Sequence, residues 1–504
     1  MEDKVQRISG HGSSDPTSSD RVANDKTPEL TGVLHPLEEK SLIRKIDLNL
    51  MPLLIVSYGL QYLDKTSLSY SAILNIQQDL GLQGQDFSWA SGIFYIGYLA
   101  ASYPISLGFV RFPLGKYLSV FIFLWGIVLT LHAVAVNYAS LMVLRTLLGV
   151  FESAISPGFS MITGMWYTPP EHVSRHSFWF AGNAIASIIG SMIAYGILYY
   201  AGDFPQWKLL FLIFGLITVA WSVLLWFYLP DSPSSAHFLT STERKLASLR
   251  PKKFQRTTQT RKWNRAQFKE TFVDPKTWWF LIFSLIISIP NGGLTSFKTL
   301  IISGFGYDKF QTILMELPAA AFQLTTVVFA AIVTTNIRRS RLFVLSGIYL
   351  IAIAGVLMIQ LLPSSKKLPR LAGFWLTTSV SPAFPLMMSL FASNTAGFTK
   401  KSSVVGLIFV GYCVGNFVGP QFFRSEEAPG YDTAFATILA CSAIVFAITL
   451  VFHIYLRRVN GKRDREQGVY IDPEEHREVH LQADEELDRV DETDMQNKDF
   501  RYVL

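Results

Sequence analysis

The sequence predicts an all-α membrane protein with twelve transmembrane helices in two six-helix bundles. Half of the 504 residues are hydrophobic and only 16% are charged, whereas soluble proteins average about 25% charged residues. The hydrophobic residues come in blocks of roughly twenty, which is long enough for a helix to cross a hydrocarbon core of about 30 Å. Six such blocks precede a long polar interval and six follow it, which indicates two halves of equal span number.

Each block is separated from the next by a polar loop. In chain order the expected spans cover 48–70, 88–107, 118–136, 139–161, 177–200, 207–228, 277–297, 311–334, 342–362, 371–391, 402–423 and 433–456. The domain organisation that follows is a disordered tail over 1–40, a first bundle over 41–228, a basic central loop over 229–276, a second bundle over 277–458 and a charged tail over 459–504. The carboxyl-terminal tail lacks apolar periodicity and is expected to be disordered from residue 462 onward.

The distribution of Lys and Arg over the loops predicts that both termini are cytoplasmic. The central loop holds eleven Lys and Arg against four Asp and Glu, while the loops over 71–87, 137–138 and 201–206 hold no Lys or Arg. Positive residues gather on the cytoplasmic side of membrane helices, which places the central loop inside. The loop over 363–370 departs from this trend with two lysines and one arginine. The asymmetry also accounts for the net charge of +6 without a nucleic-acid partner.

No motif in the sequence supports an enzyme, a metal centre or a cofactor. The stretch "GFVRFPLGKY" ends in Gly-Lys, but its glycine spacing does not match a phosphate-binding loop and no Ser or Thr follows the lysine. We find no nucleophile–His–acid pattern and no metal-ligand spacing. The two cysteines, Cys413 and Cys441, lie inside apolar blocks, where free thiols are usually inert. We therefore expect no enzyme activity, no metal and no cofactor, which leaves transport as the leading class of function.

Four ionisable residues lie inside the expected spans of the first bundle. Asp64 and Lys65 stand within "YLDKTSLSY", and Arg145 and Glu152 within "VLRTLLGVFESAISPG". An ionisable residue inside the membrane costs about 2.5–3.5 kcal/mol on insertion, so each one is a functional candidate. The helical rise places Asp64, Lys65 and Arg145 at similar heights. Glu152 lies about 10 Å deeper, on nearly the same helix face as Arg145.

This arrangement suits a proton-coupled carrier of an organic anion. Lys65 and Arg145 are predicted to bind a carboxylate, the lysine as a point charge and the arginine as a bidentate fork. Asp64 and Glu152 are predicted to bind and release the protons. Coupling has an energetic reason, because moving one negative charge into an inside-negative cell costs about 2.3 kcal/mol per 100 mV. Two structural alternatives stay open: Asp64 and Lys65 as a pair at the outer interface, and Arg145 and Glu152 as an ion pair between helices.

The second bundle offers polar side chains as further candidates for substrate binding. In "IPNGGLTSFKT" a proline and two glycines are expected to break the span, where Asn291 would offer a donor and an acceptor. In "GYCVGNFVGPQFF" the candidates are Tyr412 and Asn416, although close helix packing explains the glycines of this stretch equally well. Lys298 and Glu316 are expected near the outer mouth, in a plain interfacial role.

Several short stretches, in order and in the expected spans, carry a family resemblance. They are "RKIDLNLMPLL", "YLDKTSLSY", "FPLGKYL", "LRTLLGVFESAISPGF", "LFLIFGLIT", "LPDSP", "NGGLTSF", "GFGYDKFQT" and "GYCVGNFVGPQ". Together, over about residues 40–458, they resemble the anion:cation symporter family of the major facilitator superfamily, in particular its fungal allantoate permease-like group. The superfamily's loop signature after span two is poorly kept, since Phe112 and Pro113 stand where an acid and a base are usual. The gating salt bridge of that signature is therefore not expected here.

The resemblance implies alternating access about a central site between two pseudo-symmetric bundles. In proton-coupled members, the acidic–basic pair of span one and the Arg and Glu of span four have the roles assigned above, which carries over onto Asp64, Lys65, Arg145 and Glu152. The implied function is uptake of a small carboxylate with protons across the plasma membrane, by a monomer. Relatives in the fungal group carry allantoate, ureidosuccinate, short peptides, nicotinate, pantothenate or biotin. The alternatives are export of an acidic metabolite and a nutrient sensor that does not transport.

Overall fold

The computed structural model describes residues 36–254, 263–337, 339–468 and 491–504. The chain divides into two compact units, Met1–Arg44 and Lys45–Leu504. Of the first unit, only 36–44 are described, as the beginning of helix α1 (Pro36–Ile73). The predicted disorder of the amino-terminal tail thus falls on residues outside the described ones, apart from this helical stretch.

The described residues form helices and no strand. We call the part up to Tyr228 the N-terminal half. Its helices after α1 are α2 (Ile76–Asp79), α3 (Asp86–Arg111), α4 (Leu114–Leu131), η1 (His132–Val134), α5 (Tyr138–Glu152), α6 (Ile155–Trp166), α7 (Pro169–Leu198) and α8 (Gln206–Tyr228). The connection to the second half contains η2 (Pro233–Ser235), α9 (Ser241–Phe254) and α10 (Arg265–Val273).

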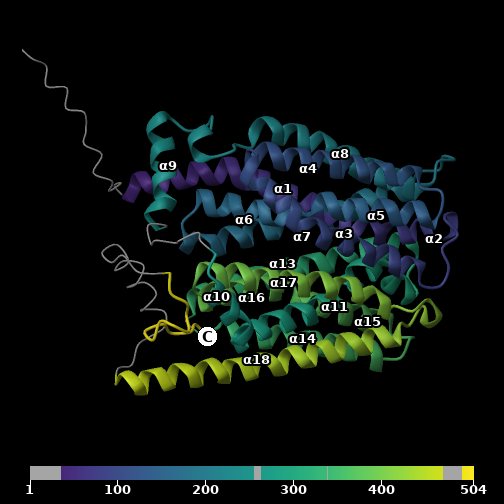
Figure 1. Ribbon diagram of the computed structural model, residues 1–504. Helices are drawn as coiled ribbons and strands as arrows, with labels where there is room; N and C mark the ends of the chain where they lie inside the picture. The colour runs from purple at the N-terminus through teal and green to yellow at the C-terminus, as the bar shows by residue number, and fades with distance from the viewer. Residues whose placement is uncertain (1–35, 255–262, 338, 469–490) are drawn as a thin grey trace, which may run out of the picture. The chain divides into compact units, whose positions relative to one another are not determined.

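The C-terminal half begins with α11 (Pro275–Gly304). Its further helices are α12 (Lys309–Leu314), α13 (Glu316–Asn336), α14 (Arg341–Leu361), α15 (Lys367–Thr377), η3 (Thr378–Val380), α16 (Ala383–Asn394), α17 (Phe398–Val418), η4 (Gly419–Phe422), η5 (Ser425–Glu427) and α18 (Asp432–Gln467). The long helices lie side by side, with α9 and α10 at one end and α2 at the other (Figure 1). We call these the proximal end and the distal end.

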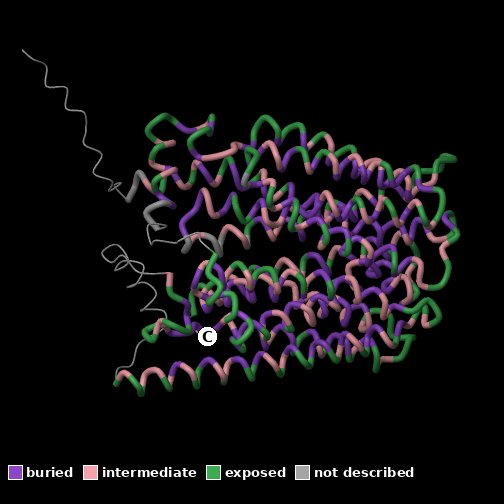
Figure 2. The backbone as a smooth tube through the Cα atoms, in the orientation of Figure 1, coloured by how far each residue is buried: buried purple, intermediate pink, exposed green. Residues whose placement is uncertain are grey.

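Twelve helical stretches of the described chain are long and apolar enough to cross a membrane, six in each half. The predicted all-α membrane fold with twelve spans is thereby confirmed. Buried and exposed positions alternate along each span (Figure 2). Many exposed positions carry large apolar side chains, for example Phe227, Phe329, Phe343 and Val451, each at least 60% exposed. Exposed apolar surface of this extent is expected where helices face lipid.

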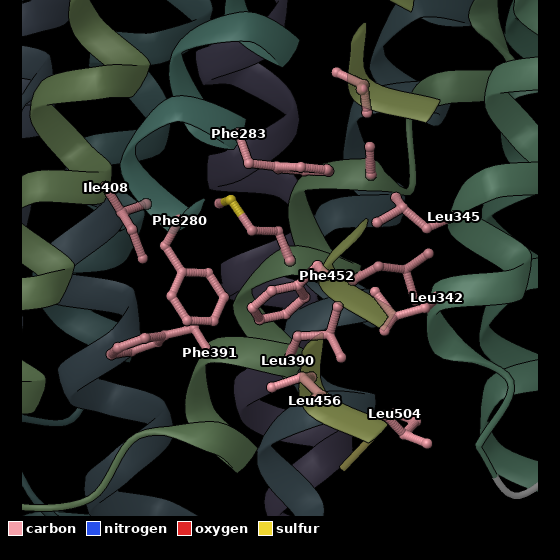
Figure 3. Close-up of a cluster of buried hydrophobic side chains, with 14 of the residues drawn as sticks. Phe280, Phe283, Leu342, Leu345, Leu390, Phe391, Ile408, Phe452, Leu456 and Leu504 are labelled. Atoms are coloured by element: carbon pink, nitrogen blue, oxygen red, sulfur yellow. The ribbon is translucent and has the colours of Figure 1, made fainter. Parts of the chain in front are cut away.

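A hydrophobic core holds the C-terminal half together. Phenylalanines from α11, α16 and α18 meet leucines from α14, α16 and α18 in this core (Figure 3). The Trp279 ring stacks on Phe452, with the ring centroids 3.9 Å apart and the planes 9° from parallel. This packing joins the first and last spans of the half, because Trp279 belongs to α11 and Phe452 to α18.

Two spans are broken near their middle, and they occupy corresponding places as the fourth span of each half. The first break separates α5 from α6 at Ser153, and the second separates η3 from α16 at Ser381. In each case a proline stands four residues further on, Pro157 and Pro385. Proline has no N–H to donate to that carbonyl, and its ring crowds the carbonyl. Broken helices in matching positions of two halves mark binding sites in membrane transporters.

The predicted break in the seventh span is wrong. Helix α11 runs without interruption from Pro275 to Gly304 and includes Pro290. Its glycines serve packing instead: a Cβ on Gly292 would lie 2.5 Å from the carbonyl oxygen of Asn416 on α17. The close approach of α11 to α17 therefore needs residues without side chains at this crossing.

Three glycines along α17 and the start of η4 have the same role. A Cβ on each would lie 2.1–2.7 Å from a carbonyl oxygen of α11; the contacts are Gly411 to Leu281, Gly415 to Leu285 and Gly419 to Ile289. Their four-residue spacing places them on one face of the helix. The close-packing interpretation of "GYCVGNFVGPQFF" is confirmed.

Residues 491–504 pack against the proximal end of the C-terminal half. The Asp494 carboxylate lies 2.8 Å from Lys276 Nζ and 3.0 Å from Lys400 Nζ, and all three side chains are almost fully buried. Tyr502 is 2% exposed, and its backbone N–H donates to Asn460 Oδ1 of α18 at 2.9 Å.

The expected disorder beyond residue 462 is wrong for two stretches. Helix α18 continues to Gln467, and residues 491–504 are held by the ion pairs and hydrogen bonds just described. Apolar periodicity did not reveal this segment because its attachment depends on charge pairing with distant lysines. The part of the predicted tail over 469–490 lies outside the described residues.

Candidate functional site

Asp64 and Lys65 extend from α1 in different directions, as neighbours on a helix must at about 100° per residue. Asp64 is fully buried, and its Oδ2 accepts a hydrogen bond from Trp125 Nε1 of α4 at 2.5 Å. Lys65 Nζ lies 2.9 Å from Glu152 Oε1 of α5. Helix α1 continues beyond both residues to Ile73. The alternative in which the two form a pair at the membrane interface is therefore wrong.

Glu152 is the last residue of α5, directly before the break in the fourth span. The start of this helix is set by Asn137, whose Oδ1 accepts from the Ser140 backbone N–H at 2.9 Å in a capping box. The Glu152 side chain is fully buried, while 17% of the Lys65 side chain remains exposed. Glu152 is thus paired with Lys65, and the alternative that pairs it with Arg145 is wrong.

Arg145 lies two turns before Glu152 on α5 and is 3% exposed. Its Nε donates to the Ala90 carbonyl of α3 at 3.2 Å, and its guanidinium carbon lies 5.7 Å from the centroid of the Phe94 ring. Its Nη1 is buried without a hydrogen-bond partner among the described residues, and so is Oδ1 of Asp64. A buried donor that makes no hydrogen bond is costly, and a guanidinium in that condition is suited to bind a carboxylate.

The four sequence-predicted charges of the N-terminal half therefore form one site. When all four are ionised, their charges sum to zero: Lys65 and Glu152 form an ion pair, whereas Asp64 and Arg145 have no ion-pair partner within 4 Å in the described part of the chain. The site can exchange internal partners for external ones, because Arg145 Nη1, Asp64 Oδ1 and Glu152 Oε2 have no hydrogen-bond partner among the described residues. That property suits reversible binding of an anion and of protons.

Aromatic rings surround the lysine of this site. Lys65 Nζ lies 5.8 Å from the centroid of Phe94 and 5.9 Å from that of Tyr98, both on α3. Rings at this distance attract a cation through their quadrupole. Tyr95 of the same helix contacts Tyr412 of α17 across the two halves, with centroids 6.1 Å apart.

Of the polar candidates in the C-terminal half, only Tyr412 has a described contact with the aromatic rings beside the four charges. Tyr412 contacts Tyr95 and also Phe384, the second residue of α16, at 5.5 Å between centroids. Asn416 is fully buried, and its Nδ2 donates back to the Tyr412 carbonyl at 2.8 Å, while its Oδ1 has no hydrogen-bond partner among the described residues. Asn291 is exposed. The contacts of the described chain thus link Tyr412 to the aromatic rings beside the four charges, and they do not link Asn291 to them.

Hydrogen bonds join the two halves at the distal end. Thr299 Oγ1 of α11 donates to the Ser69 carbonyl of α1 at 2.6 Å. Gln421 Nε2 of η4 donates to the Ser88 carbonyl of α3 at 3.2 Å. Phe297 of α11 also meets Phe87 of α3 edge to face, at 5.2 Å between centroids. These contacts close the distal end over the four charged residues.

Lys298 and Glu316 belong to this closed end, and the prediction of a plain interfacial role for them is wrong. Their Nζ and Oε2 atoms lie 2.7 Å apart, and the residues are only 8% and 2% exposed. The expected seventh span ended at residue 297, one position before the lysine, whereas α11 continues to Gly304. An ionisable residue inside a longer span was the signal that could have found this pair.

Groups of His, Cys, Asp and Glu that could hold a metal ion were found nowhere in the described ranges. Cys413 and Cys441 are both buried free thiols. The arrangement described here is therefore one of fixed charges, hydroxyls and aromatic rings from two halves of the chain.

Comparison with known proteins gives similarity to one family of membrane proteins. The family model described as Major Facilitator Superfamily matches residues 54–420. An uncharacterized transporter of Schizosaccharomyces pombe is 37% identical over 476 residues, covering 94% of this chain and 91% of its own. Allantoate permease of Saccharomyces cerevisiae is 33% identical over 482 residues, covering 93% of this chain and 87% of its own. The thiamine pathway transporter THI73 of the same yeast is 34% identical over 473 residues, covering 93% of this chain and 87% of its own.

Solved structures show the same architecture at low sequence identity. The xylose transporter XylE from E. coli, in a partially occluded inward-open conformation, has a TM-score of 0.60 at 13% identity, covering 82% of this chain and 98% of that one. A bacterial homologue of the human lysosomal transporter Spinster has a TM-score of 0.59 at 14% identity, covering 84% of this chain and 98% of that one. At this identity the likeness concerns the fold.

Proposed function

The chain belongs to the Major Facilitator Superfamily and is a membrane transporter, and from this premise we propose that it carries a small organic anion together with protons. Its family and relatives are transporters, not enzymes. We propose uptake across the plasma membrane by a monomer whose termini are cytoplasmic. Allantoate is the first substrate to test, because allantoate permease is among the similar proteins that cover nearly the whole chain.

The observation that carries the proposal is the ion pair of Lys65 and Glu152. A fully buried carboxylate keeps its charge only while a cation compensates it, and here that cation is Lys65 at 2.9 Å. A proton on Glu152 replaces the lysine as the compensating charge. Protonation of Glu152 therefore releases Lys65, and an anionic substrate can then take the place of the glutamate.

Arg145 supplies the second contact for the substrate. Its Nη1 has no hydrogen-bond partner in the described chain, and Nε is already held by the Ala90 carbonyl. The backbone contact fixes the guanidinium, while the free edge faces an incoming carboxylate as a fork. Lys65 and Arg145 together would hold one carboxylate between α1 and α5.

Asp64 is the second proton site in this proposal. Its Oδ2 accepts from Trp125, and its Oδ1 has no hydrogen-bond partner among the described residues. A proton on Asp64 would remove an uncompensated buried charge while the bound substrate occupies Lys65 and Arg145. With one proton a monoanion crosses without net charge, and with two its uptake is driven by the membrane potential, at about 2.3 kcal/mol per 100 mV.

Transport then requires the two halves to separate alternately at their two ends. The distal end is closed in this structure by the contacts of Ser69 with Thr299 and of Ser88 with Gln421. The same short hydroxyl and amide contacts are weak individually, at about 0.5–1.5 kcal/mol each. Their exchange for water on opening is therefore compatible with repeated turnover.

The experiment that tests this function is uptake by cells that lack their own permeases. Labelled allantoate, nicotinate, pantothenate and biotin are supplied at about pH 5 and about pH 7.5, which brackets the physiological range above the ordinary pKa of carboxylates, with and without a protonophore. Accumulation of one compound, stronger at the acidic pH and abolished by the protonophore, is the expected result. If the protein reaches the cell surface and accumulates none of the four, or accumulates one regardless of the protonophore, the proposal is wrong.

A further inference from the structure

Lys298 and Glu316 form a second buried ion pair, in the C-terminal half and at the distal end. Lys298 Nζ of α11 lies 2.7 Å from Glu316 Oε2 at the start of α13. The lysine also donates to Tyr70 OH of α1 at 3.2 Å, and its Nζ lies 4.5 Å from the centroid of that ring. Ser191 Oγ of α7 lies 3.5 Å from the same carboxylate oxygen.

This pair has the composition of the pair in the N-terminal half. In each case a lysine from the first span of its half faces a glutamate within 3 Å, and an aromatic ring covers the ammonium; the pairs are Lys65 with Glu152 and Lys298 with Glu316. Glu316 Oε1 is buried and has no hydrogen-bond partner among the described residues. The chemistry assigned to the first pair, exchange of an internal carboxylate for an external one, is thus available to the second.

The ion pair and the hydroxyl groups that cover it come from different halves of the chain. Both charges come from the C-terminal half, whereas Tyr70 and Ser191, which cover them, come from the N-terminal half. Separation of the halves at the distal end would remove the two hydroxyls and leave the ion pair facing the opening. Water then weakens the attraction of Lys298 for Glu316, since a hydrated pair is worth only about 0–1 kcal/mol, and an external carboxylate can compete for the ammonium.

We propose that Lys298 and Glu316 are a second anion-binding site, which takes the carboxylate of the substrate at the distal end before it reaches Lys65 and Arg145. The inference rests on the proposed function, because it assumes an anionic substrate. Lys298 is the binding group and Glu316 its internal competitor. When Tyr70 and Ser191 cover the pair again, Glu316 displaces the substrate from Lys298, and the substrate is released toward Lys65 and Arg145.

The proposal predicts opposite effects for the two members of the pair. Lys298→Gln removes the binding charge, so the KM for substrate arriving at the distal end should rise about tenfold or more, which corresponds to about 1.4 kcal/mol. Glu316→Gln removes the competitor while keeping a polar group beside Ser191, so the same KM should fall or stay unchanged. Lys298→Arg keeps the charge and should stay within about threefold of the unmodified protein.

The measurement is initial-rate transport of labelled allantoate, or of whichever of nicotinate, pantothenate and biotin the protein carries, in right-side-out and inside-out membrane vesicles. The effects should appear only for substrate supplied at the distal end, with the KM from the proximal end unchanged. Lys309→Gln is the matched control, because Lys309 is an exposed distal lysine that contacts Asn75 of the other half.

Three outcomes would contradict the proposal, each for a different reason. If both single variants lose transport and Lys298→Gln/Glu316→Gln together restores it with an unchanged KM, the pair is a structural ion pair. If Lys298→Gln transports with an unchanged distal KM, or if the KM changes equally from both ends, Lys298 does not bind substrate on arrival. If the unmodified protein carries none of the four compounds, the proposed function fails, and this site fails with it.

Discussion

The ammonium of Lys65 on α1 lies 2.9 Å from the Glu152 carboxylate of α5, and this glutamate is the last residue before the fourth span breaks. The break itself follows from Pro157, which cannot donate to the carbonyl of Ser153. The pair thus joins α1 to the end of α5, directly beside the break in the fourth span. In the proposed mechanism, transport depends on the exchange of this pair for a proton on Glu152 and a substrate anion beside Lys65.

Glu152→Gln separates proton coupling from substrate movement. The amide cannot take up a proton or ionise, so the variant should lose accumulation driven by an inward proton gradient. It should retain counterflow, in which labelled substrate outside exchanges with unlabelled substrate inside, because this exchange needs no net proton movement. Glu426→Gln, at an exposed glutamate of η5, serves as the control. Undiminished accumulation by Glu152→Gln would remove this residue from the coupling mechanism.

Arg145→Lys tests the substrate contact. Lysine keeps the positive charge but loses the planar fork, of which Nε is held by the Ala90 carbonyl and Nη1 is free. The KM for the transported carboxylate should rise about tenfold, equivalent to about 1.4 kcal/mol, with little change in the maximum rate. Kinetics of uptake at equal surface expression measure both quantities. An unchanged KM would place the anion elsewhere in the protein.

Gly149→Ala tests the close approach of α3 and α5, which positions Arg145 beside Ala90. A Cβ at Gly149 would lie 2.0 Å from the Phe94 carbonyl oxygen, so the helices must move apart. Overpacking of this kind costs about 1–3 kcal/mol, and the variant should melt at a lower temperature after purification in detergent. Gly164→Ala is the matched control, since a Cβ there would meet no atom within 4 Å apart from its own chain neighbours and the adjoining helix backbone. Equal melting temperatures for the two variants would contradict the packing described here.

Asp494→Asn tests the attachment of residues 491–504. Lys276 and Lys400 both keep Asp274 as an ion-pair partner, at 2.8 Å and 2.6 Å, so the variant loses charged hydrogen bonds without leaving an uncompensated ammonium. It should destabilise the fold by about 1.5–3 kcal/mol and lower the melting temperature at neutral pH. Glu492→Gln, at an exposed acid of the same segment, should change the melting temperature little. If the two variants melt alike, the Asp494 ion pairs do not hold the segment in place.

The same aspartate gives a defined pH dependence. Burial raises the pKa of Asp494, but the ammonium groups of Lys276 and Lys400 lower it more, so that it lies below its ordinary value of 3.8. A carboxyl with a lowered pKa stabilises the fold above its ordinary pKa, and this contribution is lost as the pH falls through the lowered value. The difference in melting temperature between the unmodified protein and Asp494→Asn should therefore be full at neutral pH and shrink only below about pH 4. A difference that is already gone at about pH 6 would contradict the pairing.

The sequence predicted the spans and the inner charges well because both depend on local patterns. A block of twenty apolar residues must be a membrane helix wherever it lies, and an acid or a base within it stands out by its cost. Asp64, Lys65, Arg145 and Glu152 were found in this way, and the structure brings them together. Which of them pair could not be predicted, because the partner of Glu152 is decided by how α1 lies against α5 and not by spacing along α5.

The misplaced predictions also have physical reasons. The glycines near Pro290 were expected to break α11. The sequence alone does not distinguish a glycine that interrupts a helix from a glycine that lets two helices approach closely. The actual breaks, at Ser153 and Ser381, are caused by prolines that stand four residues later in the chain, Pro157 and Pro385. Lys298 was assigned to the interface because the apolar block ends one residue before it. Residues 491–504 were expected to be disordered because ion pairs with distant lysines leave no periodic pattern.

The most direct test of the central claim is proton entry coupled to the anion in proteoliposomes. The purified protein is reconstituted with a pH-sensitive dye inside, without an imposed pH gradient or membrane potential, and allantoate or the carboxylate identified by uptake is added outside. The interior should become acidic only when the substrate is added, and it should not become acidic with Glu152→Gln. Uptake of the labelled carboxylate without any acidification would contradict coupling through the Lys65–Glu152 pair.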